Sequence, residues 1–346
     1  MRVGIYRGVQ NLVVEDQPEP EPGPGDVVLD VAACGICGSD VHSFAHAAWI
    51  AEGMPMGHEF AGTVRQLGEG VEGLAVGDAV AVNPFVACRT CEHCEAGRSN
   101  LCADPSRSAA AGFADQILVH DAVVGERLFP IPAGLPVEQA ALLEPLSVAL
   151  RAVTQSAVGP ADRVAVVGLG AIGQCVVQVL RHLGVRDIVG IDISPLRLQT
   201  ASQSGAASLV DALQDNAVAA VKTLYGTSFS PFREAGRVTV LFECSGALPG
   251  VQDALSMVEA GGTVVLVALF GDAPPVDLNA VVQKELRVRG SFAYTAADAQ
   301  AAFALLADGS VDMGPLITHR RPLGDLNSAF AVQMDAARSV KVLVTP

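Results

Sequence analysis

The chain of 346 residues is half hydrophobic and carries a net charge of −15, from 37 acidic and 22 basic residues. This length predicts two domains, because a domain usually takes about 100–200 residues. The acidic composition argues against nucleic acid or an anionic membrane as a partner, since either would need a basic surface. No apolar run approaches the roughly 18 residues of a membrane span, and the start of the chain lacks a signal-peptide pattern. We therefore expect a cytoplasmic protein whose partner is a small molecule.

The first part of the sequence predicts a β-rich domain of irregular strands, over residues 1–150. A hairpin-like segment at Val3–Val14 is followed by the proline-rich stretch Pro18–Pro24 and a strand at Val27–Ala33. Short apolar runs interrupted by glycine then continue to about Val124. Short apolar runs separated by glycine are typical of short strands joined by turns.

From Ala161 onward, strands and helices alternate, which predicts a doubly wound parallel sheet and places the protein in the α/β class. The expected strands are Val164–Val167, Ile188–Ile191, Val238–Phe242 and Thr263–Leu269. We expect this domain to cover residues 151–285. The last segment, residues 286–346, is expected to return to the first domain.

A dinucleotide-binding fingerprint, G-x-G-x-x-G, follows the strand at Val164. Its residues are Gly168, Gly170, Ala171, Ile172 and Gly173, with Asp192 at the end of the next expected strand. Glycines alone could form a structural turn, but a strand before and an apolar helix after them favour a nucleotide site, with the pyrophosphate at the helix N-terminus. Asp192 would bind the ribose hydroxyls and repel a 2′-phosphate, which predicts NAD rather than NADP. Arg197 either flanks the adenosine or is a solvated helix charge.

Four cysteines with metal-ligand spacing predict a structural zinc site. They are Cys88, Cys91, Cys94 and Cys102. Four thiolates close a tetrahedral shell and leave no position for substrate, so this site would stabilise a lobe of the fold. Disulfides are the alternative, and the reducing cytosol disfavours them. His93 lies inside the cluster and is expected to be a bystander.

Two further segments hold residues of the kind that bind a catalytic zinc. One is Cys34-Gly-Ile-Cys37-Gly-Ser39-Asp40-Val-His42 and the other is Gly57-His58-Glu59. From spacing alone, a cysteine and a histidine 21 positions apart are more often unrelated core residues than metal ligands.

These motifs occur in the order seen in zinc-dependent medium-chain alcohol and polyol dehydrogenases, and the sequence resembles that family over essentially its whole length. The motifs on which this resemblance rests are C-G-I-C-G-S-D-x-H, G-H-E-x-x-G, the four-cysteine lobe, E-P-L-S at Glu144 and the nucleotide fingerprint. The similarity is to the sorbitol, butanediol and threonine dehydrogenase branch. It implies a GroES-like zinc-binding catalytic domain, a Rossmann NAD domain, one catalytic and one structural zinc, and a homodimer or homotetramer.

The resemblance also implies a role for each residue around the catalytic zinc. Cys37 and His58 would hold the metal, either Glu59 or Glu144 would complete the shell, and the two would exchange as water and substrate enter. An alcohol at the open zinc position would lose its proton near neutral pH, which allows hydride transfer to the nicotinamide. Ser39 and His42 would relay the proton. Asp40 would orient the imidazole of His58.

Substrate choice depends on a pocket wall that the resemblance places at Phe44, Trp49, Phe113 and Ser291–Tyr294. Sorbitol-type relatives tend to carry an arginine where this chain has Ala293, so we expect a small secondary alcohol or diol. A polyol or L-threonine is the alternative substrate. A non-enzymatic NAD-binding zinc protein would typically have lost ligands that are present here. The long stretch Tyr225–Gly236 is expected to be a surface excursion.

Overall fold

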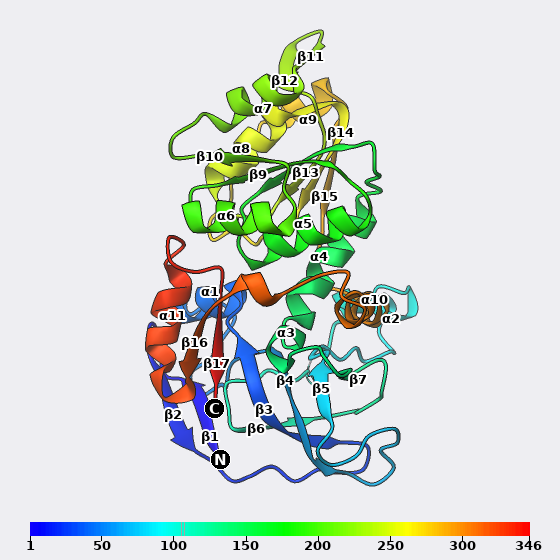
Figure 1. Ribbon diagram of the computed structural model, residues 1–346, viewed down its shortest axis with the longest axis vertical. Helices are drawn as coiled ribbons and strands as arrows, with labels where there is room; N and C mark the ends of the chain where they lie inside the picture. Colours follow the sequence, from blue (N-terminus) through cyan, green and yellow to red (C-terminus); the bar gives the residue numbers. More distant parts are fainter. Residues whose placement is uncertain (105, 107) are drawn as a thin grey trace. The chain divides into compact units, whose positions relative to one another are not determined.

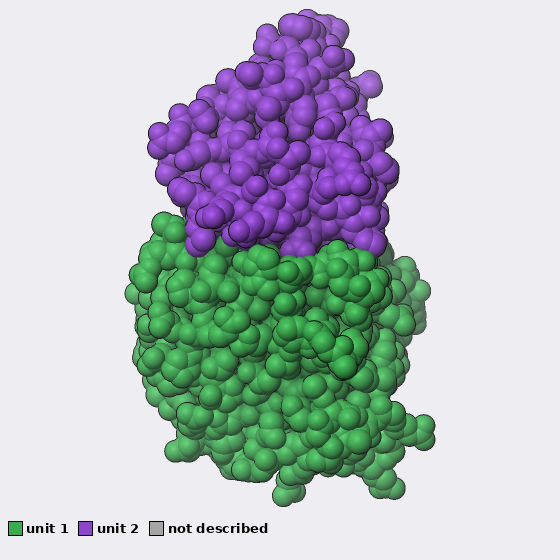
Figure 2. All heavy atoms as spheres, in the orientation of Figure 1, with its two compact units in different colours: residues 1–147, 293–346 green, residues 148–292 purple. Residues whose placement is uncertain are grey.

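The computed structural model describes residues 1–104, 106 and 108–346 and divides into two compact units, coloured separately in Figure 2. Unit 1 comprises residues 1–147 and 293–346, and unit 2 comprises residues 148–292. The second boundary lies later than the residue 285 expected from the sequence. The reason is that the strand Arg287–Gly290 pairs with the sheet of unit 2 and belongs to it.

Unit 2 contains a six-stranded parallel sheet with the strand order β10-β9-β8-β13-β14-β15. Its strands are β8 (Arg163–Val167), β9 (Asp187–Asp192), β10 (Ser208–Asp211), β13 (Val238–Glu243), β14 (Val258–Leu266) and β15 (Arg287–Gly290). The chain order reverses between β8 and β13, and loops at the carboxyl ends of strands beside such a reversal form nucleotide sites in doubly wound sheets. The predicted α/β class is therefore confirmed.

Helices lie on both faces of this sheet, with α5 and α6 on one side and α7 and α8 on the other (Figure 1). Their bounds are α5 (Ala171–His182), α6 (Pro195–Ser204), α7 (Ala217–Tyr225), α8 (Leu248–Met257) and α9 (Leu278–Gln283). The helix α4 (Leu143–Gln155) starts in unit 1 and ends in unit 2. Because both faces of the sheet are covered, its central strands are almost entirely apolar and buried.

The expected surface excursion at Tyr225–Gly236 contains a small hairpin, β11 (Thr227–Ser230) and β12 (Arg233–Gly236). Arg233 holds it to the α9 region, through an ion pair of 2.8 Å to Asp277 and a hydrogen bond to Gln283. Phe229 and Phe232 are exposed beside the turn.

Unit 1 is built on a seven-stranded sheet in the order β16-β17-β3-β4-β5-β7, with β6 paired to β3. Its strands are β3 (Val27–Gly35), β4 (Glu59–Leu67), β5 (Ala79–Val82), β6 (Gln116–Val119), β7 (Leu128–Pro130), β16 (Ile317–Pro322) and β17 (Lys341–Thr345); β1 (Arg2–Tyr6) and β2 (Leu12–Asp16) form a separate hairpin. Its helices are α1 (Gly38–His46), α2 (Glu92–Glu95), α3 (Val137–Ala140), α10 (Ala296–Ala307) and α11 (Leu326–Met334), with single 3₁₀ turns η1 (Ser99–Leu101), η2 (Gly314–Leu316) and η3 (Leu323–Asp325). The β-rich first domain is therefore present, and the last segment of the chain completes its sheet.

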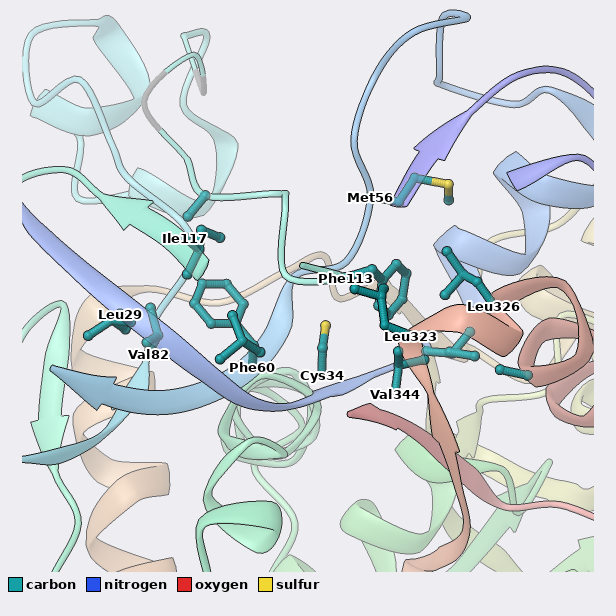
Figure 3. Packing of buried hydrophobic residues seen from close by; sticks show 14 of the residues in the cluster. Leu29, Cys34, Met56, Phe60, Val82, Phe113, Ile117, Leu323, Leu326 and Val344 are labelled. Carbon is teal, nitrogen blue, oxygen red and sulfur yellow. The ribbon is translucent and has the colours of Figure 1, made fainter. Parts of the chain in front are cut away.

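The core of unit 1 joins residues from both ends of the sequence. Figure 3 shows Phe113 beside Leu323, Leu326 and Val344, which come from the last part of the chain. Two expectations about the pocket wall are wrong here, because Phe44 and Phe113 are 4% and 0% exposed and both pack on Phe330, at ring-centre distances of 4.7 and 5.7 Å. These rings stabilise the unit and are not available to line a substrate pocket.

Among the helices formed by the described residues, none combines the length and the apolar composition that crossing a membrane requires.

The tight packing of Gly173 yields a stability prediction. A Cβ atom at this position would overlap the carbonyl oxygen of Gly168, whereas a Cβ at Gly170 would meet only the end of the flexible Arg197 side chain, at 3.9 Å. Gly173→Ala should therefore lower the free energy of unfolding by about 1–3 kcal/mol, as overpacking does, although alanine inside a helix otherwise stabilises by about 1 kcal/mol. Gly170→Ala is the control and should unfold like the wild type. A Gly173→Ala protein as stable as the wild type in urea denaturation would contradict the packing argument.

Candidate active site and metal centres

Cys37 is fixed at the N-terminus of helix α1. Its backbone is extended (φ −83°, ψ 160°), and its N–H donates to the Oδ2 atom of Asp40 over 3.0 Å. Asp40 is 5% exposed, so this carboxylate is held inside the protein by the first turn of the helix. The arrangement is an N-terminal cap, which satisfies a backbone donor that the helix leaves free.

His58 is brought to Cys37 by the pairing of two strands. It directly precedes β4, and β4 pairs antiparallel with β3 so that Glu59 lies opposite Gly35. Cys37 lies close enough to the ring of His58 to raise its pKa. Its Nδ1 atom lies 3.6 Å from the Oδ1 atom of Asp40, which is the separation of an ion pair rather than of a hydrogen bond. The sheet therefore places two sequence segments 21 residues apart at one point.

The electrostatic environment of this cluster favours a cation. Burial by itself would lower the pKa of His58, but the neighbouring Asp40, Cys37 and Glu144 raise that pKa well above its ordinary value. Burial, with Glu59 and Asp40 nearby, raises the pKa of Glu144 to about 7, against the opposing effect of His58 and Lys341. Thiolate, imidazole and carboxylate are also the donor types that zinc accepts, so these residues fit a zinc ion.

Sequence reasoning missed Lys341, which is the partner of Glu59. The Nζ atom of Lys341 lies 2.9 and 2.6 Å from the two carboxylate oxygens of Glu59, and both residues are almost fully buried. Gly35 faces this carboxylate, and a Cβ atom there would overlap it. A lysine at the start of an apolar strand was the available signal, because a buried charge requires a partner.

The proposed relay residues lie on helix α1. Ser39 lines a pocket of about 350 Å³ together with Asp40, His58 and Trp49. His42 packs its ring against Trp49 at 5.8 Å, and no hydrogen bond joins it to Ser39 within the described part of the chain. Ser39 is therefore placed next to the candidate zinc ligand, while the outer step of the relay is not formed in this conformation.

The four cysteines of the lobe come together as a compact cluster. Their sulfur atoms all lie within 4.8 Å of one another, and Cys94 Sγ is 3.9 Å from that of Cys88 and 3.5 Å from that of Cys91. A tetrahedron with zinc–sulfur distances of about 2.3 Å has edges of about 3.8 Å. Backbone N–H groups of Thr90 and Cys91 lower the pKa of Cys88 to about 6, which favours a thiolate. These four residues fit a structural zinc.

That cluster is the one group of three or more candidate ligands, over residues 1–104, 106 and 108–346, that meets this distance limit. Cys37, His58 and the two glutamates lie near one another without meeting it. Glu59 in particular is held by Lys341.

The nucleotide fingerprint forms the turn between β8 and α5. Gly168 has a positive φ of 85°, and the backbone of Ser245 packs directly against it, so a side chain has neither the conformation nor the space. Gly170 caps α5, whose first residues are Ala171 and Ile172. These first residues are partly exposed, and a helix N-terminus of this kind suits the binding of a phosphate.

Asp192 ends β9 beside this turn. Its carboxylate accepts hydrogen bonds from the N–H groups of Leu169 (2.6 Å) and Ser194 (2.8 Å). Each oxygen keeps a second lone pair for a ribose hydroxyl. The guanidinium of Arg197 lies over Gly170, next to the fingerprint.

Comparison with known proteins matches both parts of the chain. Residues 23–133 match the alcohol dehydrogenase GroES-like domain, and residues 171–308 match the zinc-binding dehydrogenase domain. A probable D-xylulose reductase A from Aspergillus terreus is 32% identical over 99% of this chain and 97% of its own length. The chain belongs to the zinc-binding alcohol dehydrogenase family. It is an oxidoreductase whose cofactors are zinc and a nicotinamide nucleotide.

Other relatives of this dehydrogenase act on different alcohols. The 2-dehydro-3-deoxy-L-galactonate 5-dehydrogenase of Pseudoalteromonas atlantica is 34% identical over 98% of this chain and 97% of its own. The crystal structure of 2R,3R-butanediol dehydrogenase from Bacillus subtilis superposes with a TM-score of 0.85 at 31% identity, covering 100% of this chain and 99% of the other. The GroES-like and Rossmann architecture is thus that of the family.

The cysteine lobe leads to a prediction about metal content. Cys91→Ser should lose one zinc per chain and unfold at a lower temperature, because binding energy at a structural site is also folding energy. His93→Ala changes the same lobe without removing a sulfur and should keep the zinc content of the wild type. Elemental analysis after gentle purification measures both. Full zinc content in a normally folded Cys91→Ser protein would refute the four-thiolate site.

Proposed function

We propose that this dehydrogenase transfers hydride between a small secondary alcohol or diol and NAD, at a zinc held by Cys37 and His58 with Glu59 or Glu144. The observation that carries this proposal is the set of acidic groups around His58, which lines the pocket of about 350 Å³ together with Ser39 and Asp40. We place the enzyme in the cytoplasm, since its eight cysteines form no disulfide among the described residues.

Each residue around the proposed zinc site has a separate role in the reaction. Zinc, when bound, makes an alcohol more acidic and stabilises the negative oxygen. Asp40 fixes the ring of His58 by its charge, and thereby the nitrogen that faces the metal. Ser39 accepts the alcohol proton through its hydroxyl, and His42 passes it toward solvent after a local rearrangement.

The lining of the pocket favours a compact substrate. Trp49, Ile50 and Met54 are apolar, and none of the described residues that line the pocket is a lysine or an arginine. An apolar wall binds the carbon skeleton of a short alcohol or diol through the hydrophobic effect. The second candidate is a polyol, which the similarity to D-xylulose reductases supports. L-Threonine ranks third, because its carboxylate has no cationic partner among the described residues of this lining.

The cofactor would bind at the fingerprint of unit 2. Its pyrophosphate would take the N-terminus of α5 at Gly170, and its adenosine ribose would bind Asp192. We propose NAD over NADP because the carboxylate of Asp192 would repel a 2′-phosphate. Arg197 would flank the adenosine.

For assembly, we propose a homodimer or homotetramer. The strand β15 forms one edge of the unit 2 sheet, and all four of its residues are exposed. An open edge can pair with a strand of another copy. Light scattering that gives the mass of a single chain at micromolar concentration would exclude this assembly.

A substrate panel tests the proposed activity. NADH formation is measured with 2,3-butanediol, xylitol, sorbitol, threitol, L-threonine and ethanol, and each reaction is repeated with NADP. We expect the largest kcat/KM for the diol with NAD. A preference for sorbitol or xylitol would favour the polyol alternative, and equal use of NADP would refute the role of Asp192.

Ser39→Ala tests the proton path. We expect kcat to fall by roughly 10²–10⁴, the usual contribution of a positioned acid–base group, with zinc content and NADH affinity unchanged. His42→Gln should be milder, because water can replace the outer end of a relay. Wild-type kcat in Ser39→Ala, where a substrate deuterium isotope effect marks hydride transfer as rate-limiting, would rule out the scheme.

A further inference from the structure

A cavity of about 630 Å³ lies at the amino ends of the strands β8, β13, β14 and β15 of unit 2. The dinucleotide fingerprint follows the carboxyl end of β8, so the cavity and the fingerprint occupy opposite ends of the sheet. Small-molecule sites usually have volumes of about 300–1,000 Å³. The described residues that line this cavity all belong to unit 2, and none of them has a role in the proposed reaction.

Two arginines of β15 line this cavity. Arg287 and Arg289 alternate with Val288, so their side chains lie on the same face of the strand, roughly 7 Å apart along it. The register places Arg287 beside Thr263 of β14, which also lines the cavity. The two side chains therefore extend from a face of the sheet, whereas pairing with another copy would use the backbone of the β15 edge.

Both guanidinium groups keep most of their hydrogen-bonding capacity. One N–H group of Arg287 donates to the carbonyl oxygen of Gly261 over 2.8 Å, and one of Arg289 donates to that of Gln155 over 3.3 Å. Neither arginine forms an ion pair with a carboxylate in the part of the chain that the structure describes. Since a guanidinium has five N–H donors, several remain available to a ligand in each case.

The two acidic residues of the described lining do not cancel this positive charge. Glu259 is already paired with Arg163, at 3.0 Å between Oε2 and Nη2. Asp162 accepts the backbone N–H of Gly159 over 2.8 Å and forms no ion pair with a described residue. The lining thus has two unpaired cations against one unpaired carboxylate, a local positive excess on a chain whose net charge is −15.

The spacing of the two arginines indicates the kind of anion that would fit. A guanidinium group is planar and binds a carboxylate through two parallel hydrogen bonds. Two such groups on one face of a strand can each bind one carboxylate of the same molecule. An anion with two carboxylates therefore matches them better than an anion with one.

We propose that this cavity is a second small-molecule site, which binds a dicarboxylate through Arg287 and Arg289. The site is separate from the zinc ligands of unit 1 and from the fingerprint of unit 2. A bound dicarboxylate would therefore leave the cofactor in place.

Titration with succinate by calorimetry tests the site in enzyme saturated with NADH. The NADH fills the helix N-terminus at Gly170, which is itself suited to an anion. We expect saturable binding that weakens roughly tenfold or more in Arg287→Gln and in Arg289→Gln, because each variant loses charge-assisted hydrogen bonds. Arg186→Gln is the control, since this arginine is exposed in unit 2 away from the cavity and its loss should leave the affinity unchanged.

Asp162→Asn should change the affinity in the opposite direction. Asparagine keeps an oxygen for the N–H of Gly159 but removes a negative charge from the lining. Succinate should therefore bind about two- to fivefold more tightly, the size of effect expected for one exposed charge. Loss in the arginine variants together with gain in Asp162→Asn distinguishes a binding site from residues that only support the fold.

Three results would overturn this inference. The first is the absence of saturable succinate binding to the wild type. The second is an unchanged affinity in Arg287→Gln and Arg289→Gln proteins that circular dichroism shows to be folded. The third is acetate or inorganic phosphate binding as tightly as succinate, which would refute the choice of a dicarboxylate. If the arginines instead join two copies of the chain, both substitutions would lower the mass found by light scattering and the wild type would bind no succinate.

Discussion

Neutralisation of buried negative charge is the constraint on which the site in unit 1 depends. Cys37, Asp40, Glu59 and Glu144 lie close enough to affect the pKa of a common neighbour, His58 or Lys341. Burial of several like charges is tolerated only where cations compensate them. Lys341 compensates Glu59 directly, and a metal ion at Cys37 would compensate the rest. The electrostatic field of this cluster therefore favours a bound cation.

This need for charge compensation gives a physical reason for the return of the last segment of the chain to unit 1. Lys341 and Glu59 are 282 residues apart in the sequence, and their pair forms only because β17 adds to the sheet that contains β3 and β4. The return of the last segment to unit 1 thus completes the charge balance as well as the apolar core around Phe330. Unit 2 needs no such return, since its fingerprint turn, helix and acidic residue all lie within residues 163–192.

The two metal sites differ in how they depend on the fold. The cysteine lobe draws four ligands from residues 88–102, so its geometry is set by one local segment. The proposed catalytic cluster draws on Cys37 just after β3, on His58 and Glu59 at the start of β4 and on Glu144 at the start of α4. Such a site also depends on residues brought in from elsewhere in the sheet, such as Lys341, which pairs with Glu59.

Local features of this protein follow from the sequence alone. The cysteine spacing and the glycine fingerprint with Asp192 act over short separations, where backbone geometry leaves few alternatives, and the alternation of strands and helices gives the α/β class. The tertiary structure decided what depends on distant contacts. Phe44 and Phe113 were expected at a pocket wall, but an aromatic ring suits a pocket and a core equally, and packing on Phe330 settles the choice. Strand β15 was missed because its exposed, arginine-rich sequence lies at a sheet edge and lacks the apolar pattern of a buried strand. Lys341 was missed because a lysine's partner cannot be inferred from its neighbours in sequence, and the pairing of β17 with β3 supplies it.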